Sequence, residues 1–570
     1  MKRPFAAALC AVFALPAWGS AGELFDPETR QFASKVDLGD LARIGVQHHG
    51  RIAILDTVAR DHLSQMYGRE GVDGTAPTFA FLELYLNAGK YLDRPVIYVR
   101  EKNMRRLLAE HLTGRAKEMF LRTYRLPPTA LVDEEALRAL TWTGRATPDD
   151  LRRSGRIASL LDVLSVLAMR GEYRVPIDRL SMRFSSFMAV GALRVFPTTA
   201  QEWSYLEELC DSPQDANASV AKLPLRLDGR FKELRDSWRA RDAEGVERIA
   251  EEFRLQQREM DVIGRLPHPA MQHLEQIYNR TYRFTIAWVG FAVSLVLMIV
   301  AAAAGDRARW PRRAGLAVLG LSTLVLLVGF AIRWLLSGRA WYLPPIMNQF
   351  EAVVGSCLLA GAAAIVLERI RKRNYFALSA AFYATVGLLS CFFLPGRMGA
   401  GIAAPHGILS SPVMAAHVAV IIVGHAFAGM TLPISVLYLC VVAFGGRRTR
   451  RAALSSAADL SAPAPPGAPA AIDRCNLIAA QLACWTVIVG TILGAYWADF
   501  AWGRWWGWDR KETWALLTAL IYLAVLHVRF VTPRPYRGVV TAVGCLLGAA
   551  AMLFNWIAVN YLLPGLHSYA

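Results

Sequence analysis

The chain has 570 residues, of which 54% are hydrophobic, and a formal net charge of +17 at pH 7. Apolar runs long enough to cross a bilayer recur from about Thr281 onward, which excludes a wholly soluble protein. Much of the positive charge lies in short loops between these runs, a pattern that marks the cytoplasmic side of a membrane protein and argues against nucleic-acid binding.

The extreme N-terminus has the layout of a secretory signal peptide. Two basic residues precede a short apolar stretch, and small residues end it at Ala21. We expect residues 1–21 to be this signal, with an uncleaved membrane anchor as the alternative. Both interpretations place the residues that follow outside the cytoplasm.

Residues 22–280 are predicted to form an exported, mainly helical soluble domain. A Thr-Pro-Asp cap signal and a terminal glycine predict a helix over 147–171, and amphipathic periodicity predicts another over 239–260. A short strand is expected within 94–100. Only Cys210 of the eight cysteines falls in this domain, so the domain has no internal disulfide, and the absence of Cys-x-x-Cys disfavours a thiol–disulfide relay.

Three histidines gather near the start of the exported domain, in the stretch QHHGRIAILDTVARDHL (47–63). They are His48, His49 and His62. Because the stretch contains no complete metal-ligand spacing, the sequence favours solvated or structural histidines.

Eight membrane spans are predicted after the exported domain, so the fold class is an all-α polytopic membrane protein preceded by a mainly helical soluble domain. With that domain outside, the loops after spans one, three, five and seven are cytoplasmic, and these are the basic loops. An Ala/Pro/Ser-rich linker over 446–474 falls on the cytoplasmic side. The predicted spans are 282–304, 314–336, 349–368, 376–394, 413–444, 475–497, 512–531 and 538–560.

The loop between spans six and seven carries the stretch WGRWWGWDRKETW (502–514), in which five of thirteen residues are Trp. An interfacial aromatic belt is the ordinary explanation for tryptophans at a membrane surface. The crowding of indoles among charged residues instead favours a large, flat, apolar ligand with charged edges, such as heme.

Histidines are common axial ligands of heme iron. The predicted topology locates three histidines of this chain relative to the membrane. His417 and His567 lie on the outer side, as does the Trp-rich loop. His527 lies about 22 Å into the seventh span at 1.5 Å per residue, nearer the cytoplasmic side.

Residues 494–516 resemble the tryptophan-rich WWD signature of the CcsA/CcmF family of cytochrome c maturation proteins. The similarity is greater to CcsA, the heme-handling subunit of the system II cytochrome c synthase. Residues 411–427, 520–529 and 555–570 resemble the family segments that carry its histidines. Residues 344–355 also resemble a family segment. The resemblance covers 340–570 by motif and 282–340 by topology only.

The resemblance implies roles for individual residues around heme b, which is both substrate and ligand. His417 and His567 would be axial ligands of an external heme, and His527 would ligate heme inside the membrane. A second buried ligand would come from a ResB/CcsB-like partner subunit or from His425, which stands where a Tyr is more usual. Within the WWD loop (497–514), the implied platform consists of Trp497, Trp502, Trp505, Trp506 and Trp508.

The polar residues of the loop and its surroundings receive supporting roles. Asp509 and Glu512 are expected to orient the loop through hydrogen bonds, and Glu351 is expected to face an outer vestibule. Arg504, Arg510 and Lys511 are either solvated or paired with heme propionates. Arg510 stands where the family usually has Pro, so the turn that leaves the loop is expected to differ.

The implied activity is that of a holocytochrome c synthase, a cytochrome c heme lyase of the cytoplasmic (inner) membrane. It would deliver heme to the outer face and attach it to the CXXCH motif of apocytochrome c, with thiol-reducing proteins as candidates for a further partner. Two alternatives remain at this point. One is a heme exporter without attachment activity. The other is a membrane assembly protein that binds another planar ligand, such as a quinone.

Overall fold

The computed structural model divides the chain into two compact units, Met1–Gln276 and Ile277–Ala570, which are described separately. The predicted signal peptide, the predicted helix over 147–171 and His567 lie outside the described residues. The described residues are 23–99, 102–112, 114–128, 194–197, 203–205, 233–261, 266–304, 309–394, 398–403, 409–446 and 468–561.

The described part of the first unit is mainly helical, with three two-stranded antiparallel sheets, β1–β2, β3–β4 and β5–β6. The short strand expected within 94–100 is β3. The elements of this unit are α2 (Pro27–Lys35), α3 (Gly39–Ala42), β1 (Gly45–His48), β2 (Arg51–Ile54), α4 (Leu55–Met66), α5 (Pro77–Leu86), η1 (Ala88–Tyr91), β3 (Ile97–Tyr98), α6 (Lys102–His111), α7 (Gly114–Thr123), β4 (Arg125–Leu126), β5 (Arg194–Pro197), β6 (Trp203–Tyr205), α13 (Ala243–Met260) and α14 (Pro269–Arg280), whose last four residues belong to the second unit.

A buried carboxylate organises the core of this unit. Glu83 on α5 accepts hydrogen bonds from Tyr91 Oη at 2.8 Å, Trp238 Nε1 at 2.7 Å and Arg241 Nη1 at 2.7 Å. Burial by itself would raise the pKa of Glu83, but the hydrogen bonds from Arg241 and Trp238 lower that pKa below its ordinary value. The carboxylate therefore stays ionised and ties α5 to segments about 160 residues away in sequence.

The second unit confirms the predicted fold class. Its described part is all helical, and it contains eight helices long and apolar enough to cross a membrane. Its elements are η4 (Tyr282–Ala287), α15 (Trp288–Ala304), α16 (Arg309–Ser337), α17 (Gln349–Arg371), α18 (Tyr375–Phe393), α20 (Pro412–Phe444), α22 (Ala468–Trp502), α23 (Arg510–Val531), η7 (Arg534–Tyr536) and α24 (Arg537–Tyr561).

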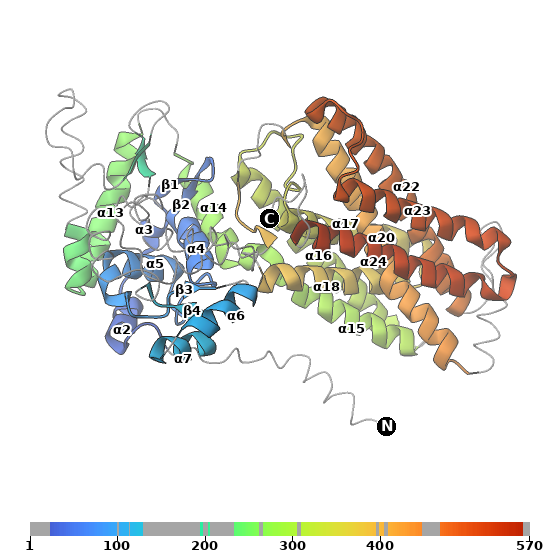
Figure 1. Cartoon of the computed structure of the whole chain (residues 1–570), viewed down its shortest axis with the longest axis horizontal. Coiled ribbons are helices and arrows are strands. Elements are labelled where there is room, and N and C mark those ends of the chain that lie inside the picture. Colours follow the sequence, from blue (N-terminus) through green and yellow to red (C-terminus); the bar gives the residue numbers. More distant parts are fainter. Residues whose placement is uncertain are drawn as a thin grey trace. The chain divides into compact units, whose positions relative to one another are not determined.

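Capping residues explain where the long helices begin. Ser411 caps α20, with Pro412 in the first turn, and Asn348 caps α17. Helix α20 has 33 residues and is about 50 Å long at 1.5 Å per residue, so it exceeds the thickness of a bilayer core. Helices α20, α22, α23 and α24 pack against one another and run side by side through the unit (Figure 1).

The structure corrects the end of the predicted linker 446–474. Helix α22 begins at Ala468, so the last seven residues of that range are helical. Alanine favours helix, and the buried Asp473 in this segment forms an ion pair with Arg529 of α23, with Nη1–Oδ1 at 2.9 Å. Paired charges stabilise a helical turn that the composition alone assigned to a linker.

Candidate functional site

The His417 ring lies directly against a glycine of the neighbouring helix. His417 is in the second turn of α20, and a Cβ added to Gly494 of α22 would lie 2.5 Å from the ring Cε1. The ring Nδ1 is 2.7 Å from the carbonyl oxygen of Gly490, one turn earlier on α22. Gly490 and Gly494 thus form a small-xxx-small pair that allows the close approach of the two helices.

This hydrogen bond determines the tautomer of His417. Because Nδ1 faces a carbonyl oxygen, it must carry the proton and donate it, which places the lone pair on Nε2. Metal-ligating histidines usually have their other ring nitrogen held in this way, since the hydrogen bond orients the ring and raises its basicity. The geometry of His417 therefore fits an axial ligand of heme iron.

Trp497 connects this histidine to the WWD loop. It follows Gly494 by three residues on α22, about 4.5 Å along the helix axis at 1.5 Å per residue. Its side chain is only 4% exposed and packs edge-to-face on Trp502, with ring centroids 5.1 Å apart. Trp497 and Trp502 thus form the packed base of the loop above His417.

The non-helical part of the WWD loop is short and tightly hydrogen-bonded. Between α22 and α23 it spans 503–509, and Gly503 and Trp508 have left-handed backbone conformations, with φ of 68° and 55°. Glu512 Oε2 accepts from the backbone N–H groups of Gly507 and Asp509 at 2.9 and 3.2 Å. The Asp509 carboxylate accepts from the Lys511 N–H at 3.1 Å and completes a capping box.

The loop therefore contains the orienting hydrogen bonds that the sequence predicted for Asp509 and Glu512. The capping box also begins α23 directly after Asp509. Arg510 is simply the first residue of the helix behind this cap.

The tryptophans of the loop differ in exposure. Trp505 and Trp508 are 53% and 71% exposed, whereas Trp506 is half-buried and packs edge-to-face on Trp508 at 5.9 Å. The Trp506 Nε1 is buried and has no hydrogen-bond partner among the described residues. Trp505 and Trp508 thus offer indole faces for stacking, whereas Trp497 is buried. Sequence reasoning did not separate the exposed tryptophans from the buried one.

Two of the basic residues in the loop region, Arg504 and Lys511, contact other residues of the chain. The Arg504 guanidinium lies against Gly507. Lys511 Nζ donates to Asn560 Oδ1 at 3.1 Å, and Asn560 Nδ2 donates to Gln349 Oε1 at 2.6 Å. This polar chain joins the start of α23 to α24 and α17, so it braces the helix that follows the loop.

His527 lies far from the loop along α23. It follows Arg510 by 17 residues, about 25 Å at 1.5 Å per residue. Its side chain is exposed on the surface of the helix, and its Nδ1 lies 2.8 Å from the Leu523 carbonyl oxygen. The lone pair again falls on Nε2.

His425 has different surroundings. It is buried in the core of the unit and packs edge-to-face on Trp556 of α24, with ring centroids 4.8 Å apart. Its Nδ1 has no hydrogen-bond partner among the described residues. A buried polar atom without a hydrogen bond lowers the stability of an apolar core, so its presence calls for a functional explanation.

The expectation that Glu351 faces an outer vestibule is wrong. Glu351 is 1% exposed and forms ion pairs at 2.9 Å with both Arg333 and Arg339. Two guanidinium groups neutralise the carboxylate and make burial favourable. Sequence reasoning missed Arg333 as a partner of Glu351. Arg333 lies inside the predicted span 314–336, and an ionisable residue at such a position indicates a partner.

The structure therefore places His417 against α22, about one turn before Trp497, and leaves His527 apart on the surface of α23. Sequence reasoning also missed Gly490 and Gly494, although the GxxxG spacing in an apolar helix signals a close helix contact.

Residues 346–567 match the family described as cytochrome C assembly protein. The cytochrome c biogenesis protein CcsA of Synechococcus sp. (strain WH7803) is 32% identical over 278 residues, which cover 44% of this chain and 83% of that protein. Protein NrfI of Wolinella succinogenes is 36% identical over 99 residues, covering 17% of this chain and 11% of NrfI. The solved structure of the cytochrome c heme lyase CcmF is 17% identical and has a TM-score of 0.36, covering 49% of this chain and 46% of that one.

Proposed function

Since the chain belongs to the cytochrome c assembly protein family as a CcsA-type member, we propose that it delivers heme and attaches it covalently to apocytochrome c. It is a multi-pass membrane protein of cytochrome c biogenesis. The observation that supports heme handling most strongly is the position of His417, whose Nδ1 is held by the backbone carbonyl of Gly490, about two helical turns before Trp497 on α22.

The outer site would bind heme b between its axial ligands and the indoles of the loop. His417 Nε2 would supply one axial ligand and His567 the other. Trp505 and Trp508 would stack on the macrocycle, because their faces are exposed, while Trp497, Trp502 and Trp506 support them. Asp509 and Glu512 would act through the loop backbone that they hold.

The attachment reaction requires little from the protein beyond positioning. Each thiol of the CXXCH motif adds across a heme vinyl group, so an S–H bond breaks, an S–C bond forms and the hydrogen goes to the other vinyl carbon. The addition needs no external oxidant or reductant, provided that the thiols are already reduced. The chain would act as a holocytochrome c synthase by holding two reactants together and by controlling the ligands of the iron.

His527 would bind heme on its way from the cytoplasmic side. Its exposed position within an apolar helix leaves an ionisable ring at the membrane-facing surface of this chain, which is unfavourable unless another polypeptide covers it. A ResB/CcsB-like subunit would cover it and supply the second ligand. His425 is the weaker candidate for that ligand because it is packed against Trp556.

The proposed location is the cytoplasmic membrane, with the first unit, the WWD loop and the C-terminus on the outer face. The basic segments 368–374 and 445–451 would then lie inside, as the charge rule requires.

The test is a covalent attachment assay in cells that lack their own cytochrome c maturation system. The full-length chain is co-expressed with a ResB/CcsB-like subunit and an apocytochrome c reporter, and heme that survives denaturing electrophoresis is measured. His417→Ala should abolish the signal, and imidazole added to the medium should restore part of it by supplying the missing ligand. Gly320→Ala, in open space on α16, serves as the control.

The same assay separates the alternatives. Heme that purifies with the chain while no covalent product forms would contradict attachment and favour a heme exporter. A chain that purifies without heme from cells with ample heme, and that forms no covalent product with the partner subunit present, would contradict both heme functions and favour a different planar ligand.

A further inference from the structure

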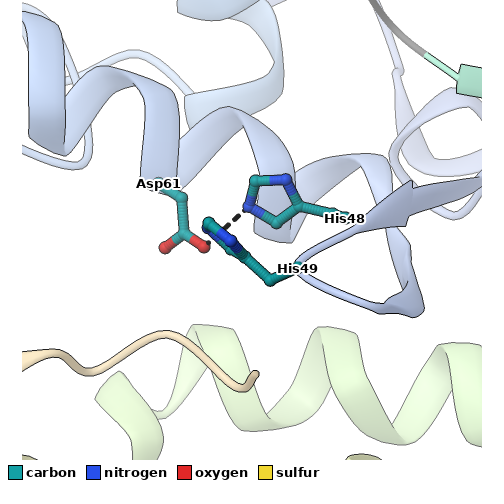
Figure 2. A group of neighbouring side chains, drawn as sticks. All are labelled: His48, His49 and Asp61. Carbon is teal, nitrogen blue, oxygen red and sulfur yellow. Dashed lines mark hydrogen bonds and ion pairs between the residues drawn. The ribbon is translucent and has the colours of Figure 1, made fainter. Parts of the chain in front are cut away.

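Two histidines and an aspartate of the first unit meet between a β-hairpin and a helix (Figure 2). His48 ends β1, His49 lies in the following turn, and Asp61 is on α4. Each offers one ligand atom, and these three atoms lie within 4.8 Å of one another. His48 Nε2 is 3.2 Å from Asp61 Oδ2, and the rings of His48 and His49 are 4.0 Å apart. The carboxylate comes from thirteen residues beyond His48, so no short sequence spacing reveals the group.

The backbone of the hairpin explains how His49 reaches this position. His48 pairs with Arg51, which leaves His49 and Gly50 as a two-residue turn with φ of 48° and 77°. Positive φ at both residues is the sign pattern of a type I′ turn, for which Asn-Gly is strongly preferred. A histidine therefore occupies a position where an asparagine would be the more favourable residue, and its ring lies beside His48 and Asp61.

The hairpin is fixed by a buried ion pair. Arg51 donates to Glu275 from Nη2 and Nη1, at 2.6 and 3.2 Å, and Thr57 at the start of α4 donates to the same carboxylate at 2.6 Å. Glu275 thus joins the hairpin to α4, the two elements that carry the three ligands. It also neutralises Arg51, the cation next to the turn. The group is held in place before any ion binds.

A third histidine, on α4, adds to the polarity of this region. His62 follows Asp61, and its ring lies 6.0 Å from the His48 ring. Its Nδ1 is buried and has no hydrogen-bond partner among the described residues. A buried polar atom without a partner beside a histidine–carboxylate group needs an explanation, and an ion or its bound water supplies one.

We propose that His48, His49 and Asp61 form a binding site for a divalent transition-metal cation of the Zn²⁺ class. Zn²⁺ binds imidazole nitrogen and carboxylate oxygen at about 2.0–2.2 Å, so tetrahedral ligand atoms are separated by roughly 3.3 Å. The His48–Asp61 separation already matches this spacing, and small rotations would bring in His49. Two nitrogen ligands disfavour Ca²⁺ and Mg²⁺, which prefer oxygen. Because His49 is exposed, the ion has a route from solvent and room for water as a fourth ligand.

The site is independent of the proposed heme chemistry and predicts a structural effect of its own. A bound cation would clamp the β1–β2 hairpin to α4, and it would raise the thermal stability of the protein because it binds the folded state only.

The experiment uses the full-length chain in detergent, without a polyhistidine tag and stripped of metal. Zn²⁺ alone is titrated by calorimetry, and Co²⁺ is titrated in parallel because its absorption reports the coordination number. The variants are His48→Ala, Asp61→Asn and His49→Asn. Asparagine tolerates positive φ, so the last variant keeps the turn. His273→Gln, on the exposed face of α14, is the matched control.

We expect the wild type and the His273→Gln control to bind one Zn²⁺ that each of the three variants loses or binds at least about 10-fold more weakly. The Co²⁺ complex of the wild type should show the intense absorption of a four-coordinate site. Equal stoichiometry and affinity in the wild type and in His49→Asn, with the metal-free melting temperature of that variant unchanged, would overturn the proposal. The absence of any Zn²⁺ binding by the wild type would overturn it as well.

Discussion

Gly494 determines where the His417 ring lies. The ring rests on the glycine, and Nδ1 reaches the Gly490 carbonyl because no side chain intervenes. Any Cβ at Gly494 would meet the imidazole, so the absence of a side chain there allows the ring to take this position. The orientation of one ring, and with it the direction of the Nε2 lone pair, depends on a residue that need not touch heme.

Substituting Gly494→Ala should therefore impair heme binding without changing any proposed ligand. The methyl group would force the His417 ring away from the Gly490 carbonyl, and the loss of such an orienting contact typically weakens metal binding by about 10- to 100-fold. Heme content after purification, measured by pyridine hemochrome, checks this. The control is Gly320→Ala, where a methyl group meets only open space. Equal heme content in both variants would show that the glycine does not position the histidine.

At the scale of elements, the WWD loop is held by the helix that follows it. Glu512, in the first turn of α23, accepts from two backbone N–H groups of the loop, and Asp509 caps the same helix. The loop geometry thus depends on the start of α23, and α23 in turn is braced by the Lys511–Asn560–Gln349 chain.

A pair of variants at Glu512 separates its structural role from an electrostatic one. Glu512→Ala removes the acceptor and should destabilise the cap by about 1 kcal/mol, so the amides of 503–509 should exchange faster with deuterium. Glu512→Gln keeps an acceptor oxygen and should preserve both amide protection and heme binding. Unchanged exchange in the alanine variant would contradict the hydrogen-bonding role. Loss of heme in the glutamine variant with normal protection would indicate that the charge itself matters.

The sequence predicted elements better than it predicted contacts. All eight spans were predictable because an apolar run of bilayer length is a strong, local signal. The first turns of α22 were not, since the segment is rich in Ala and Pro and its stabilising ion pair joins Asp473 to Arg529, 56 residues away in sequence. The burial of Glu351 and the contact of His417 with Gly494 likewise depend on which helices are neighbours, and periodicity does not reveal this.

At the scale of the whole molecule, the chain consists of two compact units, each with its own apolar core and buried ion pairs. The second unit presents apolar helices of membrane-spanning length. The first has its own apolar core and is cross-linked by buried ionic groups, among which Glu83 joins α5 to the segment around Trp238 and Arg241. The stability of the first unit should therefore depend on pH through that carboxylate.

The sign of this pH dependence follows from the lowered pKa of Glu83 in the folded state. Its stabilising contribution is fully present above the unfolded pKa, about 4.3, and is lost as pH falls through that value toward the folded pKa. Thermal unfolding of the full-length protein from pH 7 to pH 3.5 should show a lower melting temperature in acid. Glu83→Gln should lower stability at pH 7 and flatten this dependence, whereas Glu110→Gln, on the exposed face of α6, should do neither. Parallel pH profiles for the wild type and Glu83→Gln would contradict the assignment.

The visible absorption spectrum of the purified, dithionite-reduced protein, co-expressed with the proposed ResB/CcsB-like subunit, tests heme ligation by His417 most directly. The wild type should show the sharp bands of six-coordinate, low-spin heme. His417→Ala, folded and equally abundant, should lose heme or convert to a five-coordinate spectrum, and imidazole should restore the original bands. An identical spectrum and heme content in His417→Ala would mean that the heme does not use this histidine, and the proposed outer site would be wrong.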